Sequence, residues 1–229
     1  LAMTVLDGEP APRFQHARRI GQQPAKRLES PGAAIESQTG EGDRRSLLAV
    51  QRAVRGLVGG AGYRYLEIGS HLGGSIQPHL LDPRCASITS IDKRPAAQPD
   101  ERGVSFAYEG NSTARMLGLL RAVAPTDKVA TIDASAPEID PTTLGEPVQL
   151  CFIDGEHTDR AAEADFDLCL RALDGAGAIV FHDAAITYRA IAACLDRVAD
   201  QDPVAYVLPE MVFVVELGGF AVHDDPYVA

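Results

Sequence analysis

Apolar residues follow two different spacings along most of this chain. Leu47, Val50, Val54 and Leu57 recur at helical spacing, and the glycine-rich stretch 59–62 ends that helix. Beyond it, short apolar runs typical of buried strands alternate with longer stretches of helical periodicity. The runs predict strands at 63–68, 87–92, 104–108, 148–154 and within 175–183. The periodic stretches predict a short helix that begins near Ser75 and longer helices at 112–123, 162–173 and 187–200.

The last two apolar runs lie very close together. Residues 204–208 and 211–217 are separated only by Pro209 and Glu210. Two residues are too few for a crossover between parallel strands, so these runs predict an antiparallel hairpin. Strands joined through helices form parallel sheets with helices on both faces. The expected fold class is therefore α/β: a doubly wound, mostly parallel seven-stranded sheet with helices on both faces and a C-terminal antiparallel hairpin.

The length of 229 residues suits a single domain, which we expect to span residues 46–229. Residues 1–45 are polar and interrupted by proline and glycine. We expect them to form a flexible N-terminal or lid segment, with an oligomer arm as the alternative. The stretch 125–147 is long for a connection between a helix and a strand. It predicts an insert that holds an extra helix or covers a pocket, with Asp133 near the ligand.

Charge and cysteine content narrow the class of protein. A net charge of −11 argues against a nucleic-acid partner and fits a small or uncharged substrate better. No apolar run reaches the roughly 18 residues that a membrane helix needs, so we expect no membrane partner. The four cysteines lie far apart without metal-binding spacing, which predicts reduced core cysteines in a cytoplasmic protein. A homodimer or higher homo-oligomer is the default expectation at this size.

The stretch LEIGSHLGGS at 66–75 follows the first predicted strand and forms a glycine-rich turn. Gly69 and Gly73 allow the backbone to turn tightly and to approach a ligand closely. The spacing differs from the GxGxxG of dinucleotide-binding proteins, because His71 stands at the position of the second glycine. Glu67 precedes the turn, and a carboxylate there suits a positively charged ligand group better than a pyrophosphate.

Two further junctions between a strand and a helix carry polar side chains. Asp92 ends the second strand, which is the usual position of an acid that binds ribose hydroxyls. Asn111 and Ser112 follow the third predicted strand and are suited to hydrogen bonds with a base. Together with the glycine-rich turn, these residues favour a nucleoside-containing ligand at the carboxyl edge of the sheet.

Acidic and imidazole side chains end two other predicted strands. QLCFIDGEHT at 149–158 places Asp154 and His157 after the fourth strand, and IVFHDA at 179–184 places His182 and Asp183 after the fifth. At one sheet edge, two such carboxylates suit a hard divalent cation. Histidine, with an ordinary pKa of about 6.5, suits a general base. The alternative is a helix-capping acid beside a surface histidine.

The set LEIGSHLGGS, ITSID, EGNSTARML, CFIDGEHT and AIVFHDA resembles the class I S-adenosylmethionine-dependent methyltransferases, over roughly residues 45–217. FIDGEHT and FHDA narrow the resemblance to small-molecule O-methyltransferases, which include macrocin-type sugar enzymes and, more distantly, catechol O-methyltransferases. The resemblance implies a Rossmann-like methyltransferase fold, S-adenosylmethionine as cofactor, and a hydroxyl of a sugar or natural-product intermediate as methyl acceptor. It also implies the cofactor contacts: Glu67, Gly69, Ser70 and Ser75 at the methionine part, Asp92 at the ribose, and Asn111 and Ser112 at the adenine.

The same resemblance assigns roles to the acid–imidazole pairs. Asp154 and Asp183 occupy the positions of metal-ligating acids in metal-dependent relatives. Sugar-type relatives have an acid directly before the second of these, where this chain has His182, and catechol-type relatives have an amide directly after it, where this chain has Ala184. We expect His182 to be the third ligand of Mg²⁺ or Mn²⁺. His157 matches the general-base histidine of sugar-type relatives, so His157 and Asp154 form the predicted catalytic pair.

Three alternative functions fit part of this pattern. A metal-independent methyltransferase would use His157 or His182 as its base. A catalytically inactive cofactor-binding partner subunit would have no need of the acid–imidazole pairs. A nicotinamide-dependent oxidoreductase shares the fold class, but the glycine spacing and the lack of a convincing Tyr/Lys pair argue against it.

Overall fold

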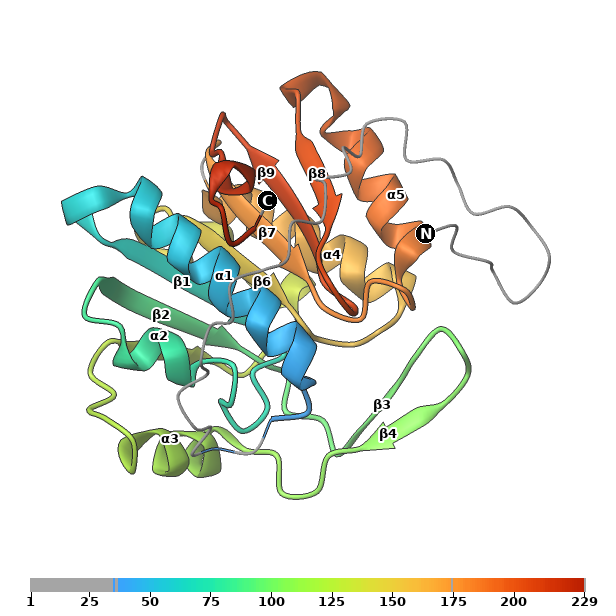
Figure 1. Ribbon diagram of the computed structural model, residues 1–229. Helices are drawn as coiled ribbons and strands as arrows, with labels where there is room; N and C mark the ends of the chain where they lie inside the picture. The colour runs from blue at the N-terminus through green and yellow to red at the C-terminus, as the bar shows by residue number, and fades with distance from the viewer. Residues whose placement is uncertain (1–34, 36, 174, 229) are drawn as a thin grey trace.

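A central sheet with helices on both faces makes up the molecule (Figure 1). The computed structural model describes residues 35, 37–173 and 175–228 of the chain. Most of the predicted flexible or lid segment 1–45 lies outside the described residues, so its role and the boundary at residue 46 stay predictions. The helices are α1 (Glu41–Leu57), α2 (Gln77–Leu81), α3 (Thr113–Arg121), α4 (Asp159–Leu173) and α5 (Tyr188–Arg197).

Seven strands form the main sheet within the described part of the chain, in the order β5-β2-β1-β6-β7-β9-β8. All neighbouring strands from β5 to β7 run parallel, whereas β9 runs antiparallel to both β7 and β8. The predicted fold class and the C-terminal hairpin are therefore confirmed. The strands are β1 (Tyr63–Ile68), β2 (Cys85–Ile91), β5 (Val129–Ile132), β6 (Leu150–Ile153), β7 (Gly177–Phe181), β8 (Val204–Val207) and β9 (Phe213–Leu217).

The prediction that residues 104–108 form a strand of the main sheet was wrong. The run 104–108 supplies β4 (Ser105–Ala107), which pairs antiparallel with β3 (Ala97–Pro99) in a separate two-stranded hairpin. The edge strand beside β2 is instead β5, which lies in the stretch predicted to be an insert. Figure 1 shows the β3–β4 hairpin projecting beyond the carboxyl ends of the main strands. All three β4 residues are exposed, so an apolar run of this length did not mean a buried strand.

Two apolar cores lie on opposite faces of the sheet. One joins the strands to α1, α2 and α3, and the other joins them to α4 and α5. Strands β6 and β7 are buried over their whole length, because helices cover them on both faces. All four cysteines are free and buried in these cores, as predicted. None of the helices in the described residues has both the length and the apolar character needed to cross a bilayer.

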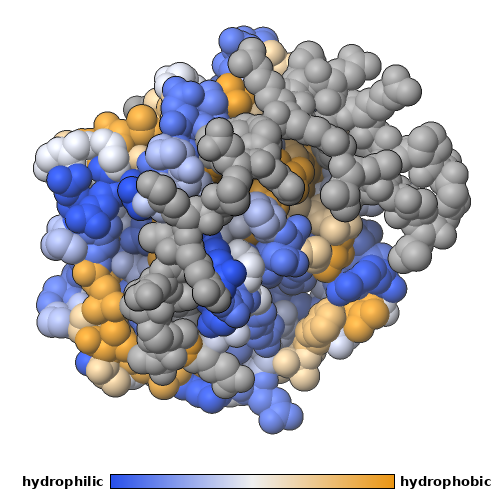
Figure 2. All heavy atoms as spheres, viewed as in Figure 1, coloured by the Kyte–Doolittle hydropathy of each residue, from blue (hydrophilic) through white to orange (hydrophobic). Residues whose placement is uncertain are grey.

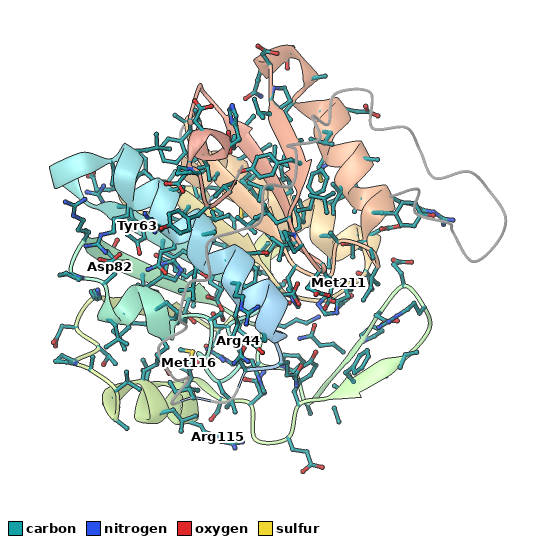
Figure 3. The ribbon with its side chains drawn as sticks, in the orientation of Figure 1. Arg44, Tyr63, Asp82, Arg115, Met116 and Met211 are labelled. Atoms are coloured by element: carbon teal, nitrogen blue, oxygen red, sulfur yellow. The ribbon has the colours of Figure 1, made fainter. Side chains whose placement is uncertain are left out.

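Helix α1 begins earlier than its apolar spacing indicated. The first apolar position is Leu47, but the helix starts at Glu41 and carries Glu41 and Asp43 in its first turn. Acids there interact favourably with the positive end of the helix dipole. Asp43 is buried, and its Oδ1 accepts the backbone N–H of Met211 at 2.8 Å, beside the first turn of α1 (Figure 3).

A buried polar cluster connects α1 to the sheet, because Gln51 of α1 donates from Nε2 to the Tyr63 hydroxyl at 2.8 Å. Tyr63 and Asp82, labelled in Figure 3, are joined by a hydrogen bond of 3.2 Å from the phenol to Oδ2. The Tyr63 hydroxyl also lies 2.9 Å from His79 Nδ1, and the His79 ring stacks on Tyr65 at a centroid distance of 3.6 Å. Burial, together with the positive charge of Lys128, lowers the pKa of His79 to about 3.

This cluster predicts how stability depends on pH. Below its ordinary pKa, His79 is protonated in the unfolded chain but stays neutral in the folded one, so the folded state loses stability as the pH falls from about 6.5. The contribution is about 1.4 kcal/mol for each pH unit. We expect His79→Gln to show a correspondingly flatter decline in the free energy of unfolding between pH 6.5 and 4.5, measured by urea denaturation. Equal pH dependence in the two proteins would contradict this.

Candidate active site

The ends of β6 and β7 bring the predicted acid–imidazole residues into one cluster. The parallel register pairs Ile153 with Phe181, so the residues that follow these strands lie side by side. His182 Nδ1 lies 2.9 Å from Asp154 Oδ1 and 3.3 Å from Asp183 Oδ2. One nitrogen and two carboxylate oxygens from these three residues all lie within 4.8 Å of one another. The three residues expected to bind a cation therefore converge.

His182 faces acids on both sides of its ring. Its Nδ1 points to the β6 and β7 carboxylates, while Nε2 lies 3.4 Å from Asp43 Oδ2 of α1. That second contact has the distance of an ion pair without the geometry of a hydrogen bond. Burial disfavours the charge on this imidazole, but the carboxylates of Asp154 and Asp183 outweigh it and raise the pKa of His182 to about 11. Asp43 was not identified from the sequence.

His157 lies on the other side of the same carboxylates. Its Nε2 is 3.3 Å from Asp183 Oδ2 and 3.5 Å from Asp154 Oδ1. Burial opposes protonation of the ring, but these two acids raise the pKa of His157. The pKa of Asp154 is correspondingly lowered, because its interactions with His182 and His157 outweigh its burial.

Asp183 adopts a left-handed backbone conformation with φ of 50°. Aspartate tolerates this region better than most residues, although it is still uncommon outside glycine. The next residue, Ala184, donates its backbone N–H to Met211 O at 3.0 Å, which fixes the turn after β7 against the start of β9. The turn thereby holds the Asp183 carboxylate toward β6.

The glycine-rich turn passes very close to the loop that carries Asp154. Gly69 has φ of 92°, and a Cβ atom at this position would lie 2.0 Å from the carbonyl oxygen of Asp154. Only glycine fits such an approach. Ser70 accepts a 2.8 Å hydrogen bond from Ser90 at the end of β2. The turn therefore lies directly beside the acid–imidazole cluster.

Glu67 lies beneath this turn and has no exposed surface. Its carboxylate accepts hydrogen bonds from Tyr65 Oη at 2.6 Å and from Ser75 Oγ at 2.5 Å. Burial raises the pKa of Glu67 to about 7. Ser75 lines the cleft above and Glu67 is not among its lining residues, so the cofactor contact expected for Glu67 stays a prediction.

Asp92 directly follows β2, and its carboxylate accepts hydrogen bonds from backbone N–H groups. Its Oδ2 accepts the N–H of His71 at 2.8 Å, and its Oδ1 accepts that of Arg94 at 2.7 Å. The nearly buried guanidinium of Arg94 donates to Asn111 Oδ1 at 3.1 Å and to His71 O at 2.6 Å. Arg94 thus ties Asn111 to the glycine-rich turn. No sequence motif had singled it out.

Of the two residues predicted to lie at the adenine, Asn111 and Ser112, only the first lines the cleft. Asn111 lines the cleft, with its side-chain oxygen bound to Arg94. Ser112 is not among the cleft residues; it is the N-cap of α3, and its hydroxyl accepts the N–H of Arg115 at 3.3 Å. Figure 3 labels Arg115 and Met116 in the first turns of that helix.

Two adjoining clefts open at the carboxyl edge of the sheet. The first, of about 300 Å³, contains the acid–imidazole cluster and the glycine-rich turn. The second, of about 330 Å³, lies between α4 and the segment after β5. Both clefts are lined by Gly69, Asp92 and Gln98, so they meet beside Asp92.

Two segments outside the strand ends also form walls of the first cleft. One is the stretch before α1, through Ser37, Gln38 and Thr39. The other is the β3–β4 hairpin, which contributes Gln98, Arg102, Phe106 and Tyr108. Figure 2 shows hydrophobic side chains at the lower right, where the hairpin lies in Figure 1. In the hairpin, Val104 and Phe106 are 47% and 40% exposed.

The comparisons with known proteins agree with this geometry. A family model described as a methyltransferase domain matches residues 66–184 of the 229, from β1 to the turn after β7. The chain therefore belongs to this methyltransferase family, and the resemblance seen in the sequence motifs is confirmed. It is an enzyme of the transferase class. A search of curated proteins gives no match.

Solved structures share the fold at low sequence identity. The O-methyltransferase NovP is 12% identical with a TM-score of 0.59, and the match covers 76% of this chain and 79% of that one. The O-methyltransferase TomG from Streptomyces achromogenes, involved in tomaymycin synthesis and solved in complex with SAM, is 13% identical with a TM-score of 0.53; the match covers 79% and 82%. These similarities establish the Rossmann-like methyltransferase fold.

Proposed function

We propose that this enzyme transfers the methyl group of S-adenosylmethionine to a hydroxyl of a small molecule, with a divalent cation at Asp154, His182 and Asp183. The observation that carries the proposal is the convergence of these three side chains beside the glycine-rich turn. NovP and TomG are both O-methyltransferases, and TomG was solved in complex with SAM, which supports the proposal. The sugar or natural-product class of the acceptor rests on the sequence resemblance.

The donor set fits a cation such as Mg²⁺ or Mn²⁺. Two carboxylates and one imidazole suit the borderline ion Mn²⁺, and carboxylates suit Mg²⁺. Asp43, at 3.4 Å from His182 Nε2, is an acid of the kind that usually orients a metal-binding histidine through its second nitrogen. When bound, a divalent cation would lower the pKa of an acceptor hydroxyl and hold it in place.

His157 is suited to the role of general base. Methyl transfer from a sulfonium is a direct displacement, so the protein must align the acceptor and remove its proton. His157 lines the first cleft beside the Asp154 and Asp183 carboxylates, where it can accept a proton from a hydroxyl bound in that cleft. The same two carboxylates stabilise the imidazolium that results.

We further propose that the cofactor spans both clefts. The methionine part would bind at Gly69, Ser70 and Ser75 in the first cleft, and the ribose would bind at Asp92, where the clefts meet. The adenine would then enter the second cleft rather than lie beside Asn111 and Ser112, because Arg94 already engages Asn111.

The lining of the second cleft supports this placement of the adenine. It includes the apolar side chains of Ala134, Ala136 and Pro137, against which a flat ring can pack. Asp165 of α4 also lines it, is only 6% exposed and receives no hydrogen bond from another described residue. Burial raises the pKa of Asp165 to about 7, so this carboxyl group can exchange hydrogen bonds with the amino edge of a purine.

Calorimetric titration tests the proposed function. S-adenosylhomocysteine is expected to bind the chelator-treated protein, and Mn²⁺ or Mg²⁺ is expected to give a separate binding heat in the presence of that product. A protein that binds no S-adenosylhomocysteine would rule out the proposal. Cofactor binding without an ion signal in any state, including with a hydroxylated acceptor present, would favour the metal-independent alternative with His157 as base.

Methyl transfer itself separates the enzyme from an inactive partner subunit. The convergence of Asp154, His157, His182 and Asp183 in an open cleft favours activity, because a binding subunit has no need of them. Transfer of labelled methyl groups to any member of a panel of sugars and phenols would support the enzyme.

A further inference from the structure

Gln98 of the β3–β4 hairpin has a buried polar atom without a partner. The residue is 8% exposed, and its side-chain Oε1 has no hydrogen-bond partner among the described residues. The backbone carbonyl oxygen of Gln98, in contrast, has a partner: it accepts a hydrogen bond from Ser105 Oγ at 3.3 Å across the hairpin. Buried acceptors are rarely left unsatisfied, because desolvating them is costly, and one found at a binding site calls for an explanation.

The position of Gln98 indicates which group would satisfy it. Gln98, Asp92 and Gly69 line both clefts, so the Gln98 amide stands where the two clefts meet. The Asp92 carboxylate already accepts the N–H groups of His71 and Arg94 and retains lone pairs for further donors. A ligand that spans both clefts therefore passes the point that Asp92 and Gln98 both line.

We propose that Gln98 Oε1 accepts a hydrogen bond from a ribose hydroxyl of the cofactor, opposite Asp92. This inference rests on the proposed function and deepens it. A ribose offers two adjacent hydroxyl donors, and the structure presents two acceptors at the junction, one at the end of β2 and one on the hairpin. The β3–β4 hairpin is then a clamp over the cofactor as well as a wall of the first cleft.

The hairpin is anchored well enough to hold Gln98 in place. Glu101 donates its backbone N–H to His157 O at 2.9 Å and accepts the N–H of Asp159, the first residue of α4, at 2.6 Å. Within the turn, the Asp100 carboxylate accepts the N–H of Arg102 at 2.8 Å. These contacts connect the arm that carries Gln98 to the loop that carries His157.

The inference is tested by binding measurements on Gln98→Leu, with S-adenosylhomocysteine and its 2′-deoxy and 3′-deoxy analogues as probes. In the wild-type protein each deoxy analogue is expected to bind roughly tenfold more weakly than S-adenosylhomocysteine. Gln98→Leu is expected to weaken the binding of S-adenosylhomocysteine by a similar factor. In this variant, one of the two deoxy analogues is expected to bind as tightly as S-adenosylhomocysteine does. Gln98→Glu, which keeps an acceptor of the same shape, is expected to retain that penalty.

The unliganded proteins provide a second readout. Leucine removes an unsatisfied buried group at similar volume, so the Tm of Gln98→Leu is expected to equal or exceed that of the wild type. A clear fall in Tm would mean that the amide has a structural partner and would overturn the inference.

The remaining outcomes separate this inference from the proposed function. If the wild-type protein binds no S-adenosylhomocysteine, the proposed function itself fails. If it binds but Gln98→Leu keeps both ribose penalties, only the role of Gln98 is refuted. An analogue that lacks the 6-amino group of adenine tests the alternative hydrogen-bond donor. If the wild type binds this analogue more weakly than S-adenosylhomocysteine and Gln98→Leu binds the two equally, then Gln98 contacts the base, and the ribose assignment is overturned.

Discussion

Asp183→Asn is expected to lower kcat/KM for methyl transfer by roughly a thousandfold and to weaken cation binding in the same protein. The substitution keeps the side-chain shape but removes one of the two carboxylates that converge with His182 Nδ1. It also preserves the backbone, because asparagine, like aspartate, tolerates the left-handed conformation that this residue adopts with φ of 50°. Substitution by alanine would add strain there and confuse the result.

Asp202→Asn is a matched control for this experiment. Asp202 also has φ of 50°, is exposed, and lies at the end of a short 3-10 helix (Ala199–Gln201), and it lines neither cleft. The control is expected to leave activity and cation binding unchanged. Binding of S-adenosylhomocysteine should be affected little in either variant. An Asp183→Asn protein that retained cation affinity and full activity would contradict the proposed metal site.

The architecture could be read from the sequence because its signals are physical and local. Strands β6 and β7 are buried on both faces and therefore appear as unbroken apolar runs. The short connection between β8 and β9 excludes a parallel crossover. These features fixed the parallel sheet and the antiparallel end without reference to any distant contact.

The edge of the sheet could not be read in the same way. Segments 104–108 and 129–132 are both short and moderately apolar, and β5 is only partly buried because it lies at the sheet edge. The predicted adenine contacts, Asn111 and Ser112, follow the first of these segments, and they stay a prediction. The residues that follow the true edge strand, Ala134 to Pro137, line the second cleft.

The site likewise contains some residues that the sequence could predict and others that it could not. Asp154, His157, His182 and Asp183 lie at strand ends, and the parallel topology alone brings strand ends together. Asp43 lines the first cleft from a helix start and Gln98 lines both clefts from a separate hairpin, while Arg94 binds the cleft residue Asn111 from a loop. Their positions depend on tertiary packing, which leaves no periodic signal in the sequence.

His157→Gln and His182→Gln are expected to separate the base from the cation ligand. Both histidines lie within 3.5 Å of the Asp154 and Asp183 carboxylates. The two variants are therefore comparable, because each replaces a histidine beside the same two acids with glutamine. His157→Gln is expected to reduce kcat by roughly 10²–10⁴-fold while cation affinity stays near that of the wild type. His182→Gln is expected to weaken cation binding by roughly 10-fold or more, because it removes the donor oriented by Asp43.

The pH dependence of kcat/KM provides the decisive readout for His157. A base must be deprotonated to act, so the wild-type rate should rise with pH through the range in which His157 loses its proton. The two carboxylates raise the pKa of this histidine, and a cation bound between them would oppose that shift. His157→Gln should remove the rising limb, whereas His182→Gln, assayed at saturating Mn²⁺, should retain it. A rising limb that survives in His157→Gln and disappears in His182→Gln would exchange the two roles.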